Sequence, residues 1–274
     1  MRVLVTGAAG MLGQDLVPFL ATDHDVTAVD LDVEITDPKV VDACFAACRP
    51  EAVFHLAAWT NVDAAEANEV DALIVNGVGT ANVARAAERL GAALVVVSTD
   101  YVFDGTQSPY SEDDPTEPIG AYGRTKLAGE EAAIAEHPKG ARIARTAWLY
   151  GAHGGNFVDT MRRLGTEREE VTVVADQEGC PTWTRDLVPA LVALLEQPPG
   201  IYHTAGGGSV TWAAFAEAIF AEAGIACRVV PVTTEEFGRP APRPARSVLE
   251  VTKPGAPRLR HWREALTDYL KETE

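Results

Sequence analysis

Short runs of apolar and β-branched residues alternate with stretches of helical periodicity through the first half of the chain. Five of these runs predict β-strands, at residues 3–5, 26–29, 52–56, 94–97 and 141–144. Between them, apolar positions recur at helical spacing, so each predicted strand is followed by a predicted helix. Strands separated in this way pair in parallel through right-handed crossovers. The sequence therefore predicts an α/β fold with a doubly wound parallel sheet and a ligand at the carboxyl ends of its strands.

A glycine-rich turn joins the first predicted strand to the helix predicted at residues 14–20. Its spacing is Gly-x-x-Gly-x-x-Gly, which allows a tight turn, close approach of the backbone to a pyrophosphate, and close packing of helix on strand. The free N–H groups of the helix would face the phosphates. An ordinary strand-to-helix turn of another α/β protein is the alternative. In the Rossmann interpretation, five residues of the turn bind a dinucleotide: Gly7, Gly10, Met11, Leu12 and Gly13.

The pattern changes after residue 144. Predicted helices and strands alternate at residues 157–164, 171–175, 187–195, 200–204, 212–223, 227–231 and 262–270. They follow one another without a linker, so we expect them to interleave with the first unit. We predict a dinucleotide-binding domain over residues 1–147, with its sheet completed by part of residues 184–204. Residues 148–274 are predicted to form mainly a small α/β substrate-binding region.

Residues directly after the second, third and fourth predicted strands have chemistry suited to a ligand. A carboxylate after the second strand can bond the hydroxyls of the adenosine ribose, and small residues after the third let the backbone lie against a cofactor. These segments supply seven candidate cofactor-binding residues: Asp30, Glu34, Ile35, Ala57, Ala58, Trp59 and Ser98. The fourth strand continues into three candidate substrate-binding residues: Thr99, Asp100 and Tyr101.

Tyr122 and Lys126 form a candidate proton-transfer pair at the start of a predicted helix. Side chains at positions i and i+4 share one helix face, so the ammonium can lie beside the phenol. A free phenol has a pKa near 10. We expect the positive charge of Lys126 to bring the pKa of Tyr122 nearer to neutral pH. The alternative is a pair of ordinary helix-surface residues, because the spacing alone is common.

Charge narrows the range of partners. The 274 residues carry a formal net charge of −17, whereas affinity for nucleic acid or anionic membranes requires a basic surface. Apolar runs stay below the roughly twenty residues that a membrane helix requires. We therefore expect neither nucleic acid nor a membrane as partner. An anionic ligand would have to be bound by individual basic side chains or backbone N–H groups at its site.

Cysteine and histidine positions give little sign of a metal site or a disulfide. The four cysteines, at positions 44, 48, 180 and 227, lack the paired close spacing of a zinc site, and the six histidines are scattered. Small buried thiols in a reducing compartment are the simplest interpretation. We predict a cytoplasmic protein with no structural disulfide and no metal site.

Taken together, these motifs give a resemblance to a known family. The glycine turn, Ser98-Thr-Asp-Tyr101 and Tyr122-x-x-x-Lys126 resemble those of the extended short-chain dehydrogenase/reductases. Within that family the chain is most similar to the dTDP-4-dehydrorhamnose reductases, over almost its whole length. The narrower resemblance rests on five stretches, at residues 98–105, 121–130, 145–151, 155–161 and 176–182.

The chemistry of the paired residues agrees with what the resemblance implies. Reducing a ketone by hydride transfer leaves negative charge on the former carbonyl oxygen, so a positioned acid lowers the barrier. Tyr122 is the expected acid. The resemblance implies that Thr99 bonds the same oxygen, that Lys126 also bonds the nicotinamide ribose, and that dTDP-4-dehydro-β-L-rhamnose becomes dTDP-β-L-rhamnose.

The cofactor is predicted to be NADPH or NADH. Asp30 favours an unphosphorylated ribose, because a carboxylate repels a 2′-phosphate. The resemblance implies NADPH, since reductases of this kind are commonly linked to NADPH and many accept both cofactors.

The later part of the chain supplies candidates for binding the rest of the substrate. Arg239, Arg243 and Arg246 suit a diphosphate, or else form a solvated basic loop. Trp148 could stack on a sugar or base, or belong to the core. Asn156 and Gln177 could bond sugar hydroxyls or cap turns. We assign Trp148, Asn156, Gln177 and Arg243 to the substrate site.

Two other functions stay open at this point. One is another nucleotide-sugar enzyme of the same family, a reductase or an epimerase with a different sugar. The other is a non-catalytic NADP-binding regulatory subunit, like the one that accompanies methionine adenosyltransferase. For the oligomeric state, a homodimer is the alternative to a monomer. Some relatives bridge subunits with magnesium, but only Asp15 is suitably placed here, so the resemblance adds no metal site.

Overall fold

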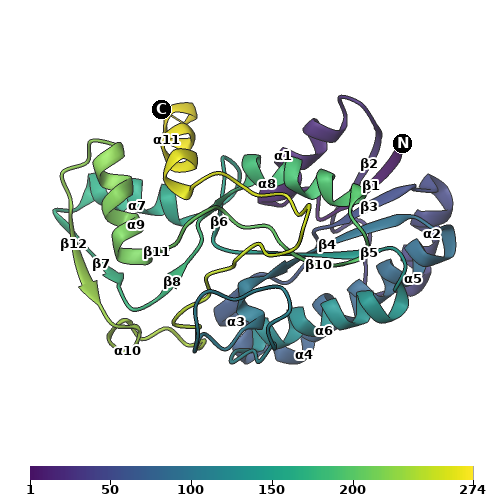
Figure 1. Ribbon diagram of the computed structural model, residues 1–274, viewed down its shortest axis with the longest axis horizontal. Coiled ribbons are helices and arrows are strands. Elements are labelled where there is room, and N and C mark those ends of the chain that lie inside the picture. The colour runs from purple at the N-terminus through teal and green to yellow at the C-terminus, as the bar shows by residue number, and fades with distance from the viewer. Residues whose placement is uncertain (274) are drawn as a thin grey trace.

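A six-stranded parallel sheet forms the centre of the larger of two lobes (Figure 1). The computed structural model describes residues 1–273. The strand order is β10-β5-β4-β3-β1-β2, with every neighbouring pair parallel, which confirms the predicted doubly wound fold. The strands are β1 (Arg2–Thr6), β2 (Asp25–Val29), β3 (Ala52–His55), β4 (Ala93–Thr99), β5 (Ala141–Thr146) and β10 (Gly200–His203).

Helices cover both faces of this sheet (Figure 1). Successive side chains of a strand point to opposite faces, so Leu4 packs into one core and Val3 and Val5 into the other. The Leu4 core is completed by α2 (Pro38–Cys48), α5 (Thr80–Leu90) and α6 (Ala121–Glu136), and the opposite core by α1 (Met11–Leu20) and α8 (Thr184–Ala193). Burial on both faces explains the continuous apolar runs of the strands.

A chain of short helices connects β3 to α5 and supports α6. It consists of α3 (Val62–Ala67), α4 (Glu69–Leu73) and the π-helical turn η1 (Ile74–Gly79). At Gly129 of α6, an added Cβ would lie 2.3 Å from the carbonyl oxygen of Asn76. Glycine at position 129 therefore lets α6 lie directly against η1, and this contact fixes the helix that carries Tyr122.

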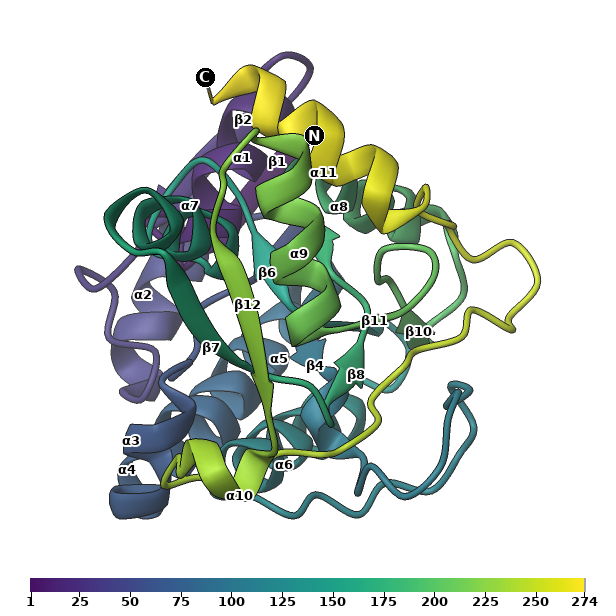
Figure 2. The ribbon, with the colours of Figure 1, turned by 90° about the vertical axis from the view of Figure 1, so that its left-hand side faces the viewer.

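The smaller lobe is built mainly from residues after 150. Figure 2 shows its two parallel strands side by side with α9 next to them. Its elements are α7 (Phe157–Glu167), β7 (Glu170–Val174), α9 (Trp212–Glu222), β12 (Arg228–Val232), α10 (Thr234–Phe237) and α11 (Trp262–Glu272). The remaining elements are short: η2 (Asp100–Val102), β6 (Leu149–Tyr150), β8 (Glu178–Gly179), β9 (Thr182–Trp183), β11 (Val210–Thr211) and η3 (Leu194–Glu196), the last of which follows α8 in the larger lobe.

The lobes are interleaved in sequence, because α8 and β10 come from the second half of the chain and pack in the larger lobe. The boundary at residue 147 stays a prediction.

A three-segment bridge of backbone hydrogen bonds spans the space between the lobes. We give this name to Tyr110, Glu178 and residues 245–250. Tyr110 N–H donates to Val248 O, and Tyr110 O accepts from Glu250 N–H, both at 2.8 Å. Glu178 N–H donates to Ala245 O at 2.8 Å, and its carbonyl accepts from Ser247 N–H at 2.9 Å. The bridge holds Ser247 against Asp100 at the end of β4.

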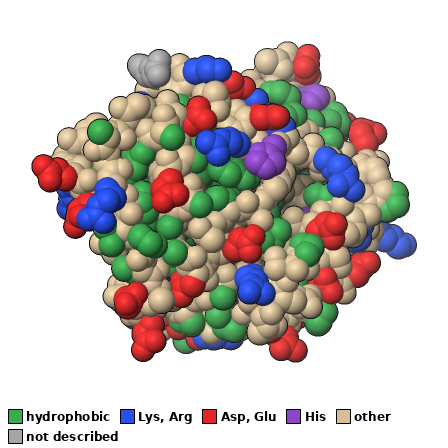
Figure 3. All heavy atoms as spheres, turned by 60° about the vertical axis from the view of Figure 1, so that its left-hand side comes forward, with side chains coloured by type: hydrophobic (Ala, Val, Ile, Leu, Met, Phe, Trp, Pro, Cys, Tyr) green, Lys and Arg blue, Asp and Glu red, His purple; other side chains and the backbone are tan. Residues whose placement is uncertain are grey.

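The surface agrees with the charge of the sequence. In the face shown in Figure 3, acidic side chains are spread over the molecule and basic ones lie singly between them. None of the helices within residues 1–273 is long and apolar enough to cross a membrane.

Candidate active site

The glycine turn lies at the carboxyl edge of the sheet, where β1 passes into α1. Gly7 has a φ of 71°, and an added Cβ there would lie 2.6 Å from the backbone nitrogen of Ala57. At Gly13 an added Cβ would lie 2.5 Å from the carbonyl oxygen of Gly7. Both positions therefore require glycine. The first-turn amides of α1 point out of the helix at this turn, so the geometry fits the phosphates of a dinucleotide.

Asp30 directly follows β2 and lies beside this turn. One carboxylate oxygen accepts from Ala9 N–H at 2.8 Å and the other from Leu31 N–H at 2.9 Å. Each oxygen keeps a free lone pair for a further donor. The carboxylate is therefore held close to where the turn would place the adenosine ribose. Glu34 is exposed and Ile35 is buried in the loop that follows, and their roles in cofactor binding stay predictions.

The segment 57–59 follows β3 and runs past the first turn of α6. Trp59 and Tyr122 pack against the same cluster of buried alanines, and the backbone N–H of Trp59 donates to Asn76 Oδ1 at 2.8 Å. The amide of Asn76 in turn donates to Thr125 Oγ1 at 3.0 Å. Asn76 thus ties the end of β3 to α6. Sequence reasoning missed it, because its partners lie 17 and 49 residues away.

Tyr122 and Thr99 meet at the junction of β4 and α6. The phenol of Tyr122 lies beside the hydroxyl of Thr99, close enough for this hydroxyl to lower the pKa of the phenol. At Gly123 an added Cβ would lie 2.1 Å from the carbonyl oxygen of Tyr101, so glycine allows α6 to sit directly on η2. The rings of Tyr101 and Tyr122 meet edge to face with centroids 5.8 Å apart. The structure therefore brings together the two residues predicted to hold a carbonyl oxygen.

The pKa of Tyr122 differs from the sequence-based expectation. Burial raises the pKa of Tyr122 to about 12, with a further rise from the charge of Asp100 and a smaller opposing effect of the Thr99 hydrogen bond. Lys126 instead donates to the carbonyl oxygen of Val97 at 2.8 Å. Burial lowers the pKa of Lys126 to about 8, against the charge of Glu130. The expected approach of the Tyr122 pKa to neutral pH was wrong, because burial and the charge of Asp100 both raise this pKa and only Thr99 lowers it.

A buried ion pair lies one helical turn beyond Lys126. Glu130 Oε2 is 2.7 Å from Arg145 Nη2, and each side chain is only 2% exposed. Ser98, predicted to contact the cofactor, donates its hydroxyl proton to Glu130 Oε1 at 2.5 Å. The i+4 spacing from Lys126 to Glu130 could have indicated this cluster, but the position of Arg145 could not be read from the sequence. The cofactor role of Ser98 stays a prediction.

Asp100 is buried beside the candidate pair. Its side chain accepts from Thr99 Oγ1 at 3.0 Å. Burial raises the pKa of Asp100 to about 7, although hydrogen bonds from Ser247 and Thr99 oppose the rise. A carboxyl group of this kind is largely neutral below pH 7, unlike the exposed carboxylates of the surface.

Trp148 lies where β5 leaves the sheet. Its backbone has a φ of 47°, a conformation that non-glycine residues rarely adopt. The indole stacks on Trp212 with centroids 3.4 Å apart and rings 6° from parallel. At Gly179 an added Cβ would lie 2.5 Å from the Trp148 ring. Trp148 is therefore half-buried and held by the smaller lobe, and its contact with a sugar stays a prediction.

The contacts of Asn156 and Gln177 are internal. Asn156 is the N-cap of α7, accepting from Asp159 N–H at 3.0 Å and donating to Gly151 O at 2.9 Å. Gln177 is buried and donates to Thr234 Oγ1 at 2.9 Å. These contacts support the capping alternative for Asn156. Substrate binding by either residue stays a prediction.

Two of the three candidate arginines share one carboxylate. Arg243 Nη2 lies 3.0 Å from Asp63 Oδ1, and Arg239 Nη1 lies 3.3 Å from Asp63 Oδ2. Arg243 also lies near the hydroxyl of Tyr101 and opposes the rise of its pKa, which places the guanidinium next to the candidate site. Arg246 is exposed on the three-segment bridge. Asp63 thus holds Arg243 in position and offsets part of the positive charge.

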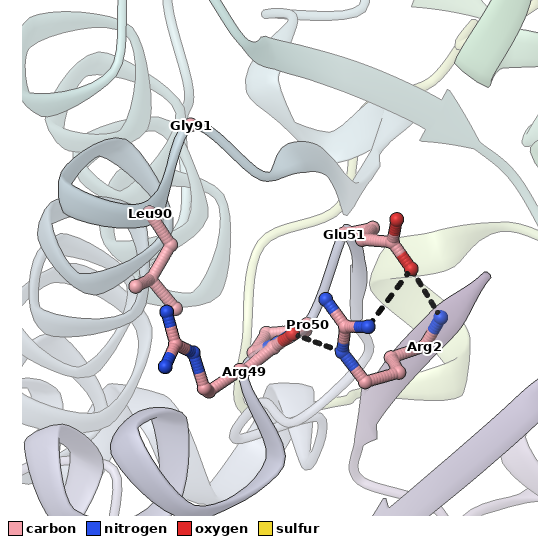
Figure 4. Close-up of a pocket in the computed structure, with 6 residues that line it drawn as sticks. All are labelled: Arg2, Arg49, Pro50, Glu51, Leu90 and Gly91. Carbon is pink, nitrogen blue, oxygen red and sulfur yellow. Dashed lines mark hydrogen bonds and ion pairs between the residues drawn. The ribbon is translucent and has the colours of Figure 1, made fainter.

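A shallow pocket of about 180 Å³ lies elsewhere. Figure 4 shows it between Arg2, Arg49 and Glu51, with Leu90 and Gly91 on its far side. Arg2 begins β1 and Glu51 precedes β3, so the pocket is at the amino edge of the sheet. Ligands of open parallel sheets bind at the carboxyl edge, so we do not assign a function to this pocket.

Comparison with known proteins agrees with this geometry. Residues 1–274 match the family described as RmlD substrate binding domain. The chain is 46% identical over 280 residues to a dTDP-4-dehydrorhamnose reductase of Streptomyces griseus, covering 97% of this chain and 92% of that protein. It is 45% identical over 274 residues to a dTDP-4-keto-6-deoxy-D-glucose reductase of Streptomyces niveus, covering 97% and 95%. The crystal structure of a dTDP-4-dehydrorhamnose reductase of Bacillus anthracis in complex with NADP superposes with a TM-score of 0.96 at 41% identity, covering 99% of both chains.

Proposed function

The chain belongs to the RmlD substrate binding domain family, and from this premise we propose that it is an NAD(P)H-dependent reductase of nucleotide-activated 4-keto-6-deoxysugars. Its substrate is dTDP-4-dehydro-β-L-rhamnose and its product dTDP-β-L-rhamnose. The observation that carries this proposal is the Thr99–Tyr122 pair, which lies at the carboxyl edge of the sheet that also holds the glycine turn. Relatives at 41–46% identity that are named as such reductases support the substrate.

The residues of the site have separate tasks in this reduction. When bound, NADPH or NADH supplies the hydride for C4 of the sugar. Tyr122 donates its phenolic proton to the ketone oxygen, and its raised pKa keeps that proton in place at neutral pH. Thr99 is the second hydrogen-bond donor to this oxygen. Lys126, still mainly protonated at pH 7 with a pKa of about 8, anchors α6 to β4 and bonds the nicotinamide ribose.

Substrate binding follows from the residues around this pair. We place the diphosphate of the sugar nucleotide against Arg243, which Asp63 holds beside Tyr101. Trp148 borders the sugar, and Asp30 bonds the ribose of the cofactor.

A spectrophotometric assay of cofactor oxidation tests the function. The panel contains dTDP- and UDP-linked 4-keto-6-deoxysugars, with products identified by chromatography. We expect the fastest oxidation with dTDP-4-dehydro-β-L-rhamnose. A different preferred ketosugar would assign the chain to another reductase of the family, as the Streptomyces niveus relative illustrates. Product formation without net oxidation would indicate an epimerase, and no reaction with any sugar would refute the proposal.

Replacing Thr99 with Val is expected to lower kcat by about 10-fold to 10²-fold, with a smaller change in KM. The variant removes one donor to the ketone oxygen and keeps Tyr122. Steady-state kinetics with the preferred ketosugar measure both constants. Thr172→Val, at an exposed position of β7, is the matched control. Unchanged kinetics of the Thr99 variant would mean that another donor holds the oxygen.

The choice between the two cofactors depends on Asp30. The protein uses NADPH or NADH, and we expect the lower KM for NADH because the Asp30 carboxylate repels a 2′-phosphate. Asp30→Asn keeps an acceptor for Ala9 N–H and removes the charge. It should lower the KM for NADPH relative to that for NADH by about fivefold, a value typical of one exposed charge contact. Strict use of NADPH by the unchanged protein would contradict this role of Asp30.

A further inference from the structure

Thr99 has a single hydroxyl proton, and several groups compete for it. Its oxygen lies 3.0 Å from Asp100 Oδ1 and accepts from Tyr101 N–H at 3.2 Å. The phenol of Tyr122 lies beside the same hydroxyl. An ionised carboxylate can only accept hydrogen bonds. While Asp100 is ionised, the proton of Thr99 is therefore directed at Asp100.

Reduction of a ketone requires the hydroxyl proton of Thr99 to point at the ketone oxygen and not at Asp100. The ketone oxygen accepts hydrogen bonds and gains negative charge as hydride arrives. With Tyr122 as the acid, Thr99 is the second donor, and it can donate only if its proton is released from Asp100. A protonated Asp100 meets this requirement. Its O–H can donate to Thr99 Oγ1, so the two side chains stay hydrogen-bonded although Thr99 no longer donates to Asp100.

The surroundings of Asp100 favour its protonated form. The side chain is 2% exposed, and within residues 1–273 its Oδ2 atom is buried without a hydrogen-bond partner. The titratable groups that it faces are Tyr101 of η2, Tyr122 of α6 and Cys180 of the segment before β9. Burial raises the pKa of each of these, so all three are neutral near pH 7. The hydroxyls of Thr99 and of Ser247 on the three-segment bridge also face the carboxyl group.

We propose that Asp100 is the positioning residue that sets the direction of the Thr99 hydroxyl, donating to Thr99 when protonated and withdrawing the Thr99 proton from the ketone when ionised. The inference rests on the proposed reductase function. Hydride still passes from nicotinamide to C4 and the proton from Tyr122 to the oxygen, so Asp100 transfers nothing. Its ionisation also raises the pKa of Tyr122 and weakens the acid.

The pH dependence of kcat/KM tests this role. Because the pKa of Asp100 is about 7, activity of the unchanged protein should fall by about threefold to fourfold between pH 6 and 7.5. The amide of Asp100→Asn can donate to Thr99 at every pH. This variant should lose activity severalfold at pH 6, through altered contacts in the site, and then change by less than about 1.5-fold up to pH 7.5. Both proteins should lose activity above pH 8, where Lys126 deprotonates.

Two further variants separate this role from a structural one. Asp113→Asn changes an exposed carboxylate of the loop before α6 and should keep the full fall between pH 6 and 7.5. Thr99→Val, which has no hydroxyl to direct, should show a smaller fall than the unchanged protein.

Thermal unfolding gives an independent readout of the same protonation. Ionising a buried carboxyl group destabilises the folded state as pH rises above the pKa of the unfolded chain. The melting temperature of Asp100→Asn, relative to the unchanged protein, should therefore be higher at pH 8.5 than at pH 4.5. An unchanged fall in activity in Asp100→Asn, or a flat profile of the unchanged protein, would overturn the inference. Absence of any ketosugar reduction by the unchanged protein would instead refute the proposed function.

Discussion

Replacing Tyr122 with Phe is expected to lower turnover by about 10² to 10⁴-fold, the usual contribution of a general acid, and to leave cofactor affinity nearly unchanged. The variant loses the phenolic hydroxyl, and with it the proton that the ketone oxygen must receive. Its ring can still pack against Tyr101 and against the alanine cluster that Trp59 also contacts, so the surroundings of the site should keep their form. Steady-state kinetics give the loss in kcat, and titration of protein fluorescence with NADPH gives the affinity.

Tyr202→Phe is a suitable control for this experiment. Tyr202 lies in β10, where its hydroxyl donates to Pro198 O at 2.6 Å, away from the Thr99–Tyr122 pair. Its loss should affect stability more than turnover. Turnover of Tyr122→Phe within a factor of about three of the unchanged protein would remove Tyr122 from the proposed reaction.

Replacing Glu130 with Gln is expected to lower the free energy of unfolding by about 3–5 kcal/mol. The reason is that Arg145 keeps its charge after the change, and a buried charge without its partner is strongly destabilising. Both side chains of the pair are 2% exposed, so solvent cannot replace the lost carboxylate. Urea unfolding at pH 7, followed by circular dichroism, measures the effect.

An exposed ion pair on the same helix provides the comparison. Glu136 of α6 pairs with Arg85, and their side chains are 34% and 43% exposed. Glu136→Gln should cost less than about 1 kcal/mol, the usual value for a surface pair. If both variants lost the same free energy of unfolding, burial would not make the Glu130–Arg145 pair more important for stability than the exposed pair.

The sheet and its ligand edge could be predicted because the information for them is local. The apolar run at residues 94–97 has the length and composition of a strand buried on both faces, and β4 includes it. The spacing of Gly7, Gly10 and Gly13 specifies a turn between strand and helix. Thr99 and Tyr122 could be expected to approach each other because one ends a strand and the other starts a helix at the same edge of the sheet.

Contacts between distant segments could not be predicted. Glu66 accepts from Ala121 N–H at 2.7 Å and so holds the first turn of α6, although it lies 55 residues earlier. Asp63 forms ion pairs with arginines of a segment more than 170 residues away. The Tyr122 pKa depends on how much protein covers the phenol, which periodicity does not reveal. The strands β6, β8, β9 and β11 have two residues each and leave no pattern in the sequence.

Because α8 and β10 follow the other sheet strands in the sequence, they are synthesised after them on the ribosome. Leu187, Val188 and Leu191 of α8 cover the same core as Leu12 and Leu16 of α1. About 50 residues must be added after β5 before β10 can pair with it, which takes about 3–10 s at common translation rates. During that interval the nascent sheet has an open edge and an uncovered apolar face, the features that chaperones recognise and that drive aggregation. The growing polypeptide, more than the finished enzyme, is thus the form most exposed to misassembly.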